Sequence, residues 1–293
     1  MAFTDSTNPS SNPGGQAEKA ERFRLRHQKG SPLLILPNAW DAPSARIFEQ
    51  LGFPAVATTS SGLATALGYP DGERISRDQL IEAVERIARV VNCPVSVDIE
   101  AGYGTSIPAI QETVKMIIKA GGVGINVEDS RPASQPELVE PEYQVDLIAA
   151  IREKVTSLGV PVVINARTDV FLLEVGEPER RVELAVERAR AYLEAGADCV
   201  YPIGALPRQW IADLASSIPG PINVLAGPFA PPLRELAALG VARVSFGGGL
   251  MRAALGYARA AARELLEQGT YALLGQEALS GQDFETLFQL TSM

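Results

Sequence analysis

The sequence contains one histidine, two cysteines and no excess of positive charge, and each shortage argues against a class of function. The 293 residues carry a net charge of −9 with a pI of about 4.9, so the chain lacks the basic face that nucleic acid or an anionic membrane requires. No apolar run approaches the roughly eighteen residues that cross a bilayer. We therefore expect a cytoplasmic protein with neither nucleic acid nor membrane as a partner.

The cysteines and the histidine are poorly placed for catalysis. Cys93 and Cys199 lie in or beside apolar runs, which favours buried, reduced thiols over a disulfide framework. His27 precedes the first strand-like run, so we expect it on the surface or packed against a helix. Proton transfer by an imidazole at the active site is therefore not expected.

The amino-terminal segment differs in composition from the rest of the chain. Residues 1–16 are rich in Ser, Asn, Pro and Gly and contain no apolar stretch, which predicts a disordered leader. The chain as a whole is 46% hydrophobic and 21% charged, and its length suffices for a large core. We predict that residues 17–293 form a single domain.

Short β-branched runs alternate with longer amphipathic stretches from Arg22 onward. The runs are nearly continuously apolar, as expected for parallel strands covered on both faces. Ser76 is placed to cap one of the intervening helices, and Asn38 and Asp41 could cap the first. The eight predicted strands are residues 33–37, 55–59, 95–98, 123–127, 162–166, 199–202, 222–225 and 243–246.

Eight strand–helix units in a chain of this length predict an α/β fold of the (β/α)8 TIM-barrel type. A doubly wound open sheet is the alternative, but it usually has fewer strands. The first predicted strand is also not followed by a glycine-rich dinucleotide fingerprint.

The carboxyl ends of barrel strands form one rim, where the chemistry of such enzymes takes place. Asp98 and Glu100 end an apolar run just before a glycine-rich turn, and carboxylates in this position suit a divalent cation such as Mg2+. A plain acidic loop is the alternative. The polar residues expected at the rim are Asn38, Asp41, Ser60, Ser61, Gly62, Asp98, Glu100, Glu128, Asp129, Asn165, Arg167, Asn223 and Ser245.

The rim offers positive groups as well as acids. Backbone amides at Ser61 and Gly62 could bind a substrate carboxylate. Arg167 could clamp a second anionic group with two parallel hydrogen bonds. A small anionic oxo-acid is therefore the expected substrate.

Several motifs in order resemble those of the isocitrate lyase/phosphoenolpyruvate mutase superfamily over roughly residues 33–254. They are Ser61-Gly62-Leu63, Gly68-Tyr69-Pro70-Asp71, the stretch from Asp98 to Gly104, Val127-Glu128-Asp129 and Asn165-Ala166-Arg167-Thr168-Asp169. The resemblance implies a (β/α)8 barrel whose carboxy-terminal helix is exchanged between subunits of a homodimer or homotetramer.

The resemblance also implies a set of site residues. Asp98 would bind Mg2+ directly, with Mn2+ as an alternative ion, while Asp71, Glu100 and Glu128 would hold it through water. Arg167, Tyr103 and Glu128 are the expected catalytic residues. The expected substrate-binding residues are Ser60, Ser61, Gly62, Asp98, Arg167, Asn223 and Ser245.

The loop at residues 130–142 departs from the family pattern. It begins Ser-Arg-Pro-Ala-Ser-Gln-Pro-Glu, without the Lys-Arg/Lys-Cys-Gly motif of (methyl)isocitrate lyases or the Lys-Thr-Asn segment of the phosphonomutase. Ile203 stands where relatives place His or Glu. We therefore do not expect a standard (methyl)isocitrate lyase, and Tyr103, Arg131, Ser134 or a metal-bound water remains for proton transfer.

The function predicted from the sequence is a Mg2+-dependent lyase. It would cleave a C–C bond, by retro-aldol fission or decarboxylation, in a small 2-oxo or 2-hydroxy carboxylate through an enolate intermediate. One alternative is P–C chemistry, as in a phosphonomutase or phosphonopyruvate hydrolase. The other is a barrel that binds an oxo-acid without turning it over.

Overall fold

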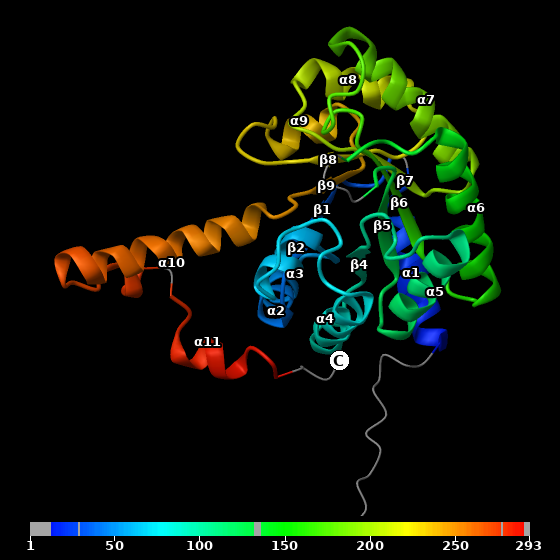
Figure 1. The fold of residues 1–293 in the computed structure, drawn as a ribbon. Helices are drawn as coiled ribbons and strands as arrows, with labels where there is room; N and C mark the ends of the chain where they lie inside the picture. Colours follow the sequence, from blue (N-terminus) through cyan, green and yellow to red (C-terminus); the bar gives the residue numbers. More distant parts are fainter. Residues whose placement is uncertain (1–12, 29, 132–135, 277, 290–293) are drawn as a thin grey trace, which may run out of the picture.

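Parallel strands alternate with helices through the computed structural model, which describes residues 13–28, 30–131, 136–276 and 278–289 (Figure 1). Each of the eight predicted strands overlaps an observed one, and β5 and β6 extend one and two residues beyond their predicted ends. The strands are β1 (Leu34–Leu36), β2 (Asn38–Ala39), β3 (Val56–Thr58), β4 (Val95–Asp98), β5 (Gly124–Glu128), β6 (Val163–Thr168), β7 (Cys199–Pro202), β8 (Asn223–Leu225) and β9 (Arg243–Ser245).

The strands pair as two parallel sheets, in the orders β2-β3-β4-β5-β6-β7 and β1-β9-β8. At one seam β1 and β2 are parts of one extended segment, separated by Pro37, whose carbonyl accepts a hydrogen bond from Ala57 N at 2.9 Å. At the other seam Val200 in β7 forms a parallel bridge with Ile222, next to β8. The two sheets therefore follow one another around a single ring, which confirms the predicted TIM-barrel fold.

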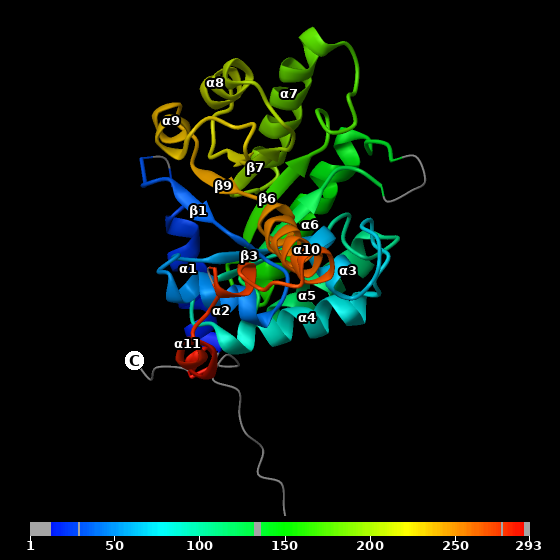
Figure 2. The same cartoon turned by 90° about the vertical axis from the view of Figure 1, so that its left-hand side faces the viewer.

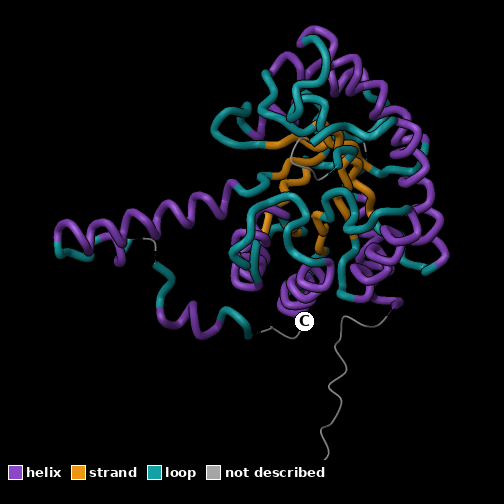
Figure 3. Tube along the Cα trace, in the orientation of Figure 1, coloured by secondary structure: helices purple, strands orange, loops and turns teal. Residues whose placement is uncertain are grey.

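Helices surround the strands, and most of the loops in view lie outside the strand core (Figure 3). Two predicted caps are present: Asp41 accepts from Ser44 N at 2.7 Å, and Ser76 accepts from Gln79 N at 3.2 Å. The main helices are α2 (Ala42–Gln50), α3 (Ser60–Ala66), α4 (Arg77–Val90), α5 (Ile107–Lys119), α6 (Pro141–Ser157), α7 (Arg181–Glu194), α8 (Arg208–Ser217) and α9 (Leu233–Ala238).

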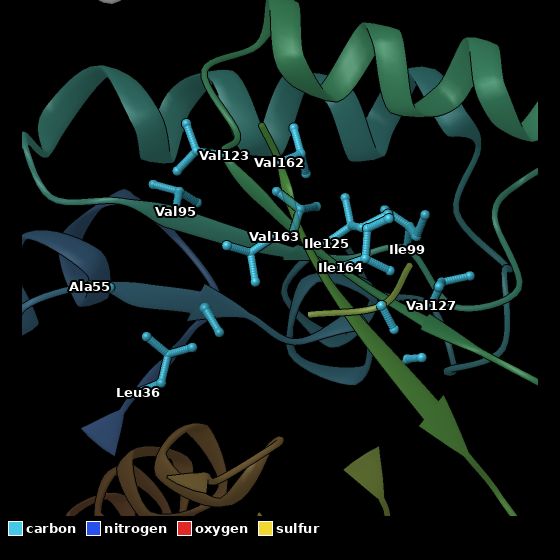
Figure 4. Packing of buried hydrophobic residues seen from close by; sticks show 14 of the residues in the cluster. Leu36, Ala55, Val95, Ile99, Val123, Ile125, Val127, Val162, Val163 and Ile164 are labelled. Atoms are coloured by element: carbon cyan, nitrogen blue, oxygen red, sulfur yellow. The ribbon is translucent and has the colours of Figure 1, made fainter. Parts of the chain in front are cut away.

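The core packs β-branched side chains between the strands and the helices (Figure 4). In β5, Ile125 and Val127 are fully buried among these side chains, while the alternate residues Asn126 and Glu128 are polar. Because successive side chains of a strand point to opposite faces, this alternation directs the polar residues into the barrel. The apolar shell thus fixes the positions of the residues that form the site.

Helix α1 (Pro13–Leu25) corrects the predicted leader, because the last four residues of segment 1–16 belong to this helix. Gln16 Nε2 donates to the carbonyls of Ile118 at 2.7 Å and Gly122 at 3.1 Å, which holds the first turn against the barrel. Residues 1–12 lie outside the described residues. His27 follows α1 and is buried rather than on the surface, with its Nδ1 donating to the Phe23 carbonyl at 2.9 Å.

Helix α10 (Gly249–Gln268) leaves the barrel and projects away from it (Figures 1 and 2). Its side chains Leu255, Leu265 and Leu266 are 50%, 46% and 87% exposed. Helix α11 (Gly281–Thr286) follows, and Arg46 of α2 donates to the Leu287 carbonyl just beyond it at 2.8 Å. Helix exchange between subunits stays a prediction. Across the described ranges, no helix combines the length and the apolar character needed to cross a membrane.

Candidate active site

A cavity of about 290 Å³ opens at the carboxyl ends of the strands. Five of the predicted site residues line it together with Asn38: Ser60, Ser61, Asp98, Arg167 and Ser245, with the predicted metal ligand Asp71 beside them. A second cavity of about 250 Å³ shares Ser60, Asp71 and Arg167 with the first and adds Glu100 and Glu128. The structure therefore brings most of the predicted residues together, around two adjoining spaces.

Asp98 ends β4 and is held from several sides. Its Oδ2 accepts from Ser60 N at 3.0 Å, and its Oδ1 accepts from Asn126 Nδ2 at 2.9 Å. Asn126 is fixed in turn by Asn165 Nδ2, which donates to Asn126 Oδ1 at 2.7 Å. This chain of amides orients the carboxylate while leaving lone pairs on both of its oxygens for a ligand.

The neighbouring acids repel one another. Burial, and then the charge of Asp98, raise the pKa of Asp71 and raise the pKa of Glu100 to about 7. Burial also raises the pKa of Glu128 well above its usual range, against the opposing effect of Arg167. Carboxylates in this state favour a bound cation, which would relieve both the repulsion and the desolvation.

The four acids fit a hydrated divalent cation rather than a tight protein cage. Among the residues that the structure describes, no three His, Cys, Asp or Glu side chains lie together as a ready-made metal cluster. Asp98, with both oxygens oriented, suits a direct ligand, and Mg2+ in proteins usually keeps several waters. Ligation through water by Asp71, Glu100 and Glu128 stays a prediction.

Arg167 lines the cavity, but its guanidinium is already paired. Its Nε donates to Asp169 Oδ1 at 2.6 Å, its Nη2 to Asp169 Oδ2 at 3.0 Å, and its Nη1 lies 2.7 Å from Glu128 Oε2. Ser130 completes the network, because its hydroxyl donates to Asp169 Oδ2 at 2.6 Å. The bidentate contact expected for a substrate anion is therefore made to Asp169 in this structure.

Beneath this network lies a second buried one that ties helix α7 to the strand ends. Asp129 accepts from Tyr192 Oη at 2.7 Å, from Arg188 Nη1 at 3.1 Å and from the backbone of Asp169 at 2.9 Å. Arg188 also donates to the Val139 carbonyl at 3.0 Å. Asp129 therefore supports the site from behind and does not line either cavity.

Three predicted residues occupy positions other than those expected. The Tyr103 hydroxyl donates to Glu100 Oε1 at 2.7 Å. Tyr103 lines neither of the two cavities but a third one, which is lined by residues of α4 and α6. Asn223 begins β8 rather than following it, and it bonds to Ser245 Oγ at 3.0 Å below the cavity. Gly62 is needed for space, because a Cβ would lie 2.5 Å from Thr59 Cγ2 and 2.9 Å from Trp40 Cβ.

The cavity also contains residues that sequence reasoning missed. Arg243, Tyr201 and Arg252 all line it, and Arg243 is only 2% exposed. The cavity lining also has an apolar part, which includes Leu172, Ile203, Leu225 and Phe246. Residues 132–135 of the departing loop, Ser134 among them, lie outside the described residues. His27 and the two cysteines line neither of the two cavities.

Comparison with known proteins places this geometry in a family. Residues 23–266 match the family model described as phosphoenolpyruvate phosphomutase. The 2-methylisocitrate lyase of Escherichia coli (strain K12) is 32% identical over 207 residues, which cover 68% of this chain and 67% of that protein.

Solved structures give the same result. A proposed phosphonomutase from Burkholderia cenocepacia J2315 is 41% identical, covers 84% of this chain and 99% of its own, and superposes with a TM-score of 0.80. A phosphonopyruvate hydrolase in complex with oxalate and Mg2+ is 25% identical, covers 92% of this chain and 94% of its own, and also has a TM-score of 0.80.

Proposed function

The chain belongs to the phosphoenolpyruvate phosphomutase family, within the isocitrate lyase/phosphoenolpyruvate mutase superfamily, and from this premise we propose that it is a Mg2+-dependent C–C lyase. Its substrate is a small 2-oxo or 2-hydroxy carboxylate, which it cleaves by retro-aldol fission or decarboxylation. The observation that carries the proposal is one cavity with an acidic, oriented metal ligand at Asp98 and an apolar wall formed by Leu172, Ile203 and Leu225. Such a wall suits a carbon skeleton.

The metal would be held by Asp98 directly and by Asp71, Glu100 and Glu128 through water. When bound, Mg2+ supplies a Lewis acid that stabilises negative charge developing on the oxo oxygen of an enolate. The Mg2+ complex of the related phosphonopyruvate hydrolase supports this assignment.

The remaining steps fall to the side chains of this chain. Ser60 and Ser61 line the cavity at the start of α3 and are placed to orient the substrate carboxylate. The Glu100 carboxyl can exchange a proton near neutrality, because its pKa is about 7. The Tyr103 hydroxyl orients it by donating a hydrogen bond and stays protonated, because burial and the Glu100 charge raise its pKa. Glu128 and Arg167 hold the opposite side of the mouth in fixed orientation.

A second candidate is P–C bond chemistry, as in a phosphonomutase or phosphonopyruvate hydrolase. It is favoured by the 41% identity to the proposed phosphonomutase, which exceeds the 32% identity to the E. coli 2-methylisocitrate lyase. The apolar part of the lining argues for the carbon substrate, because Leu172, Ile203 and Leu225 offer no hydrogen-bond donor to phosphonate oxygens.

The assembly forms part of the same proposal. Helix α10 projects from the barrel with Leu255, Leu265 and Leu266 exposed, which supports burial of this helix against another copy of the chain in a homodimer or homotetramer. The molar mass in solution tests this directly.

Turnover of oxaloacetate, 2-methylisocitrate and phosphonopyruvate, each with and without Mg2+, tests the function. We expect Mg2+-dependent cleavage of a carbon substrate, loss of that cleavage in Asp98→Ala, and unchanged turnover in the surface control Arg89→Met. Cleavage of phosphonopyruvate alone would establish the P–C alternative. Metal-dependent binding of oxo-acids without any turnover would establish the non-catalytic binding barrel.

A further inference from the structure

The two arginines buried in the cavity wall differ in their partners. Every nitrogen of the Arg167 guanidinium faces a carboxylate, from Asp169 or from Glu128. Arg243 is more deeply buried, yet its Nε and Nη1 have no hydrogen-bond partner among the residues that the structure describes. Of the two buried arginines, Arg243 is therefore the one whose charge is uncompensated, while Arg252, the third arginine of the cavity, is exposed to solvent.

The position of Arg243 follows from the strand that carries it. It begins β9, two residues before Ser245, so both side chains point into the barrel, with Arg243 nearer its amino end. Arg243 lines the same cavity as Asp98, together with Ser96 and Asn126. The guanidinium thus lies at the floor of the site whose mouth holds the metal ligands.

The groups around Arg243 do not neutralise it. The polar neighbours that act on its charge are Cys199, Tyr201 and Asp98, and burial raises the pKa of both the thiol and the phenol to about 12, so these two are uncharged at neutral pH. His27, which also senses Arg243, is held neutral because burial lowers its pKa to about 3. Asp98 is the one charged neighbour, and it is oriented toward Ser60 and Asn126.

A buried guanidinium without an acceptor is costly, because arginine cannot lose its proton and each unpaired donor has given up its hydrogen bond to water. Ser96 Oγ is a second buried polar atom without a partner that belongs to a residue lining the same cavity. Once a cation neutralises Asp98, the charge of Arg243 is left without any compensation. The two unpaired donors of the Arg243 guanidinium therefore favour an acceptor that carries negative charge.

We propose that Arg243 and Ser96 form an anion subsite at the cavity floor, which binds the distal carboxylate of a 2-oxo diacid whose oxo-acid end lies at Asp98. The identity of the oxo-acid end rests on the proposed function, whereas the subsite rests on the unpaired donors. A free small anion such as chloride has the same acceptor chemistry and is the competing occupant.

The subsite makes the protein selective for diacids. In a ligand that carries a methyl group in place of the distal carboxylate, Arg243 stays desolvated and unpaired, which penalises the complex more than the lost contact alone. A cavity of about 290 Å³ holds only a small substrate, so one molecule can span from the mouth to the floor.

Calorimetric binding in the presence of Mg2+ tests the subsite with two matched ligand pairs. One pair is 3,3-difluorooxaloacetate and 3,3-difluoro-2-oxobutyrate, and the other is 2-oxoglutarate and 2-oxovalerate. We expect the wild type to bind at least one diacid about tenfold or more tightly than its partner, the factor that one charge-assisted hydrogen bond provides. Arg243→Met should abolish the preference, and the exposed-arginine control Arg89→Met should retain it.

Arg243→Met with an unchanged diacid preference would overturn the proposal. If that variant does not fold, the side-chain Nε–H resonance of Arg243 in 15N-arginine-labelled wild type decides: it should shift on adding the diacid but not the monoacid. The resonance is assigned with Arg243→Lys, and a signal indifferent to both ligands would also overturn the proposal.

Two further arms separate the sources of the anion and the two proposals. Replacing gluconate by chloride should leave the wild-type melting temperature unchanged if the subsite binds the substrate carboxylate and not free chloride. A chloride-dependent rise that Arg243→Met abolishes, with no diacid preference in the wild type, would assign the subsite to a free anion and refute the substrate role. A diacid preference without turnover would refute the lyase and leave the subsite standing.

Discussion

Arg167 should contribute strongly to folding, because its guanidinium joins two buried carboxylates from neighbouring strands. Arg167→Met removes two hydrogen bonds to Asp169, at 2.6 and 3.0 Å, and a contact to Glu128 at 2.7 Å. Removing one partner of a buried ion pair costs about 3–5 kcal/mol, since the other charge stays desolvated. We expect a loss of that size in the free energy of unfolding without metal at pH 7.

Arg167→Lys should fall between the wild type and Arg167→Met. Lysine keeps the charge but cannot form the two parallel bonds to Asp169, and one charge-assisted hydrogen bond contributes about 1.5–3 kcal/mol. Ser130, which donates to Asp169 at 2.6 Å, would partly compensate in both variants.

Urea unfolding followed by circular dichroism, with EDTA present, measures these differences. Arg89→Met, an exposed arginine of α4, serves as the control and should change stability by less than about 0.5 kcal/mol. If Arg167→Met unfolds within about 1 kcal/mol of the wild type, the carboxylates are not compensated by Arg167, and the charge balance described for the site is wrong.

The remaining predictions concern metal, pH, thiols and assembly. Mg2+ or Mn2+ should raise the melting temperature through mass action, and Asp98→Ala should abolish the rise. The raised pKa of Glu100, about 7 against the ordinary 4.5, means that the folded chain retains a proton that the unfolded chain has released between these values. Metal-free stability should therefore fall as pH rises from about 4.5 to 7, while Mg2+ affinity should rise over the same range, and a flat response in the wild type would contradict this. Glu100→Gln should lose part of the slope and keep the part that the raised pKa values of Asp71 and Glu128 supply. Since burial raises the pKa of Cys93 and Cys199 to about 12, thiol reagents should leave activity intact, and rapid inactivation that substrate prevents would refute this. Leu266→Glu on α10 should lower the molar mass measured by light scattering if this face is buried between subunits, and an unchanged mass would contradict that arrangement.

The sequence was sufficient to predict the fold because the apolar runs have the length and spacing of barrel strands. The limits predicted for β4 and β7 agree with the structure residue for residue. The first strand differs from its prediction, because extended backbone continues past residue 37. Pro37 separates β1 from β2, and β2 pairs with β3, which the apolar run alone does not indicate. The amino-terminal leader was predicted too long, since its composition does not reveal that Gln16 donates to backbone carbonyls in the last turn of α5 and just after it.

The candidate site was predictable where a side chain follows the end of a strand and less so where it lies along one. Asp98 and Ser245 are the last residues of β4 and β9, and both line the cavity. Asn223 was misplaced because a shift of two residues within an apolar run moves a side chain from the rim to the barrel interior, and the run alone does not fix that register. Tyr103 was misplaced because its backbone is left-handed, with φ of 53°, which turns the ring toward Glu100 and a separate cavity.

Arg243 shows why the charge balance of a barrel cannot be read from its strands one at a time. A charged residue at the first position of a strand ordinarily lies at a solvent-exposed edge, and the triplet Arg243–Ser245 gives no local reason to think otherwise. Pairing of β9 with both β1 and β8 closes the ring around the side chain and removes it from water. Whether such a charge has a partner depends on residues from distant strands. Within the described part of the chain, Arg167 contacts two carboxylates, whereas Nε and Nη1 of Arg243 have no partner. Closure of the ring buries Arg243 and leaves two of its donors unpaired, so these donors can bind an anion.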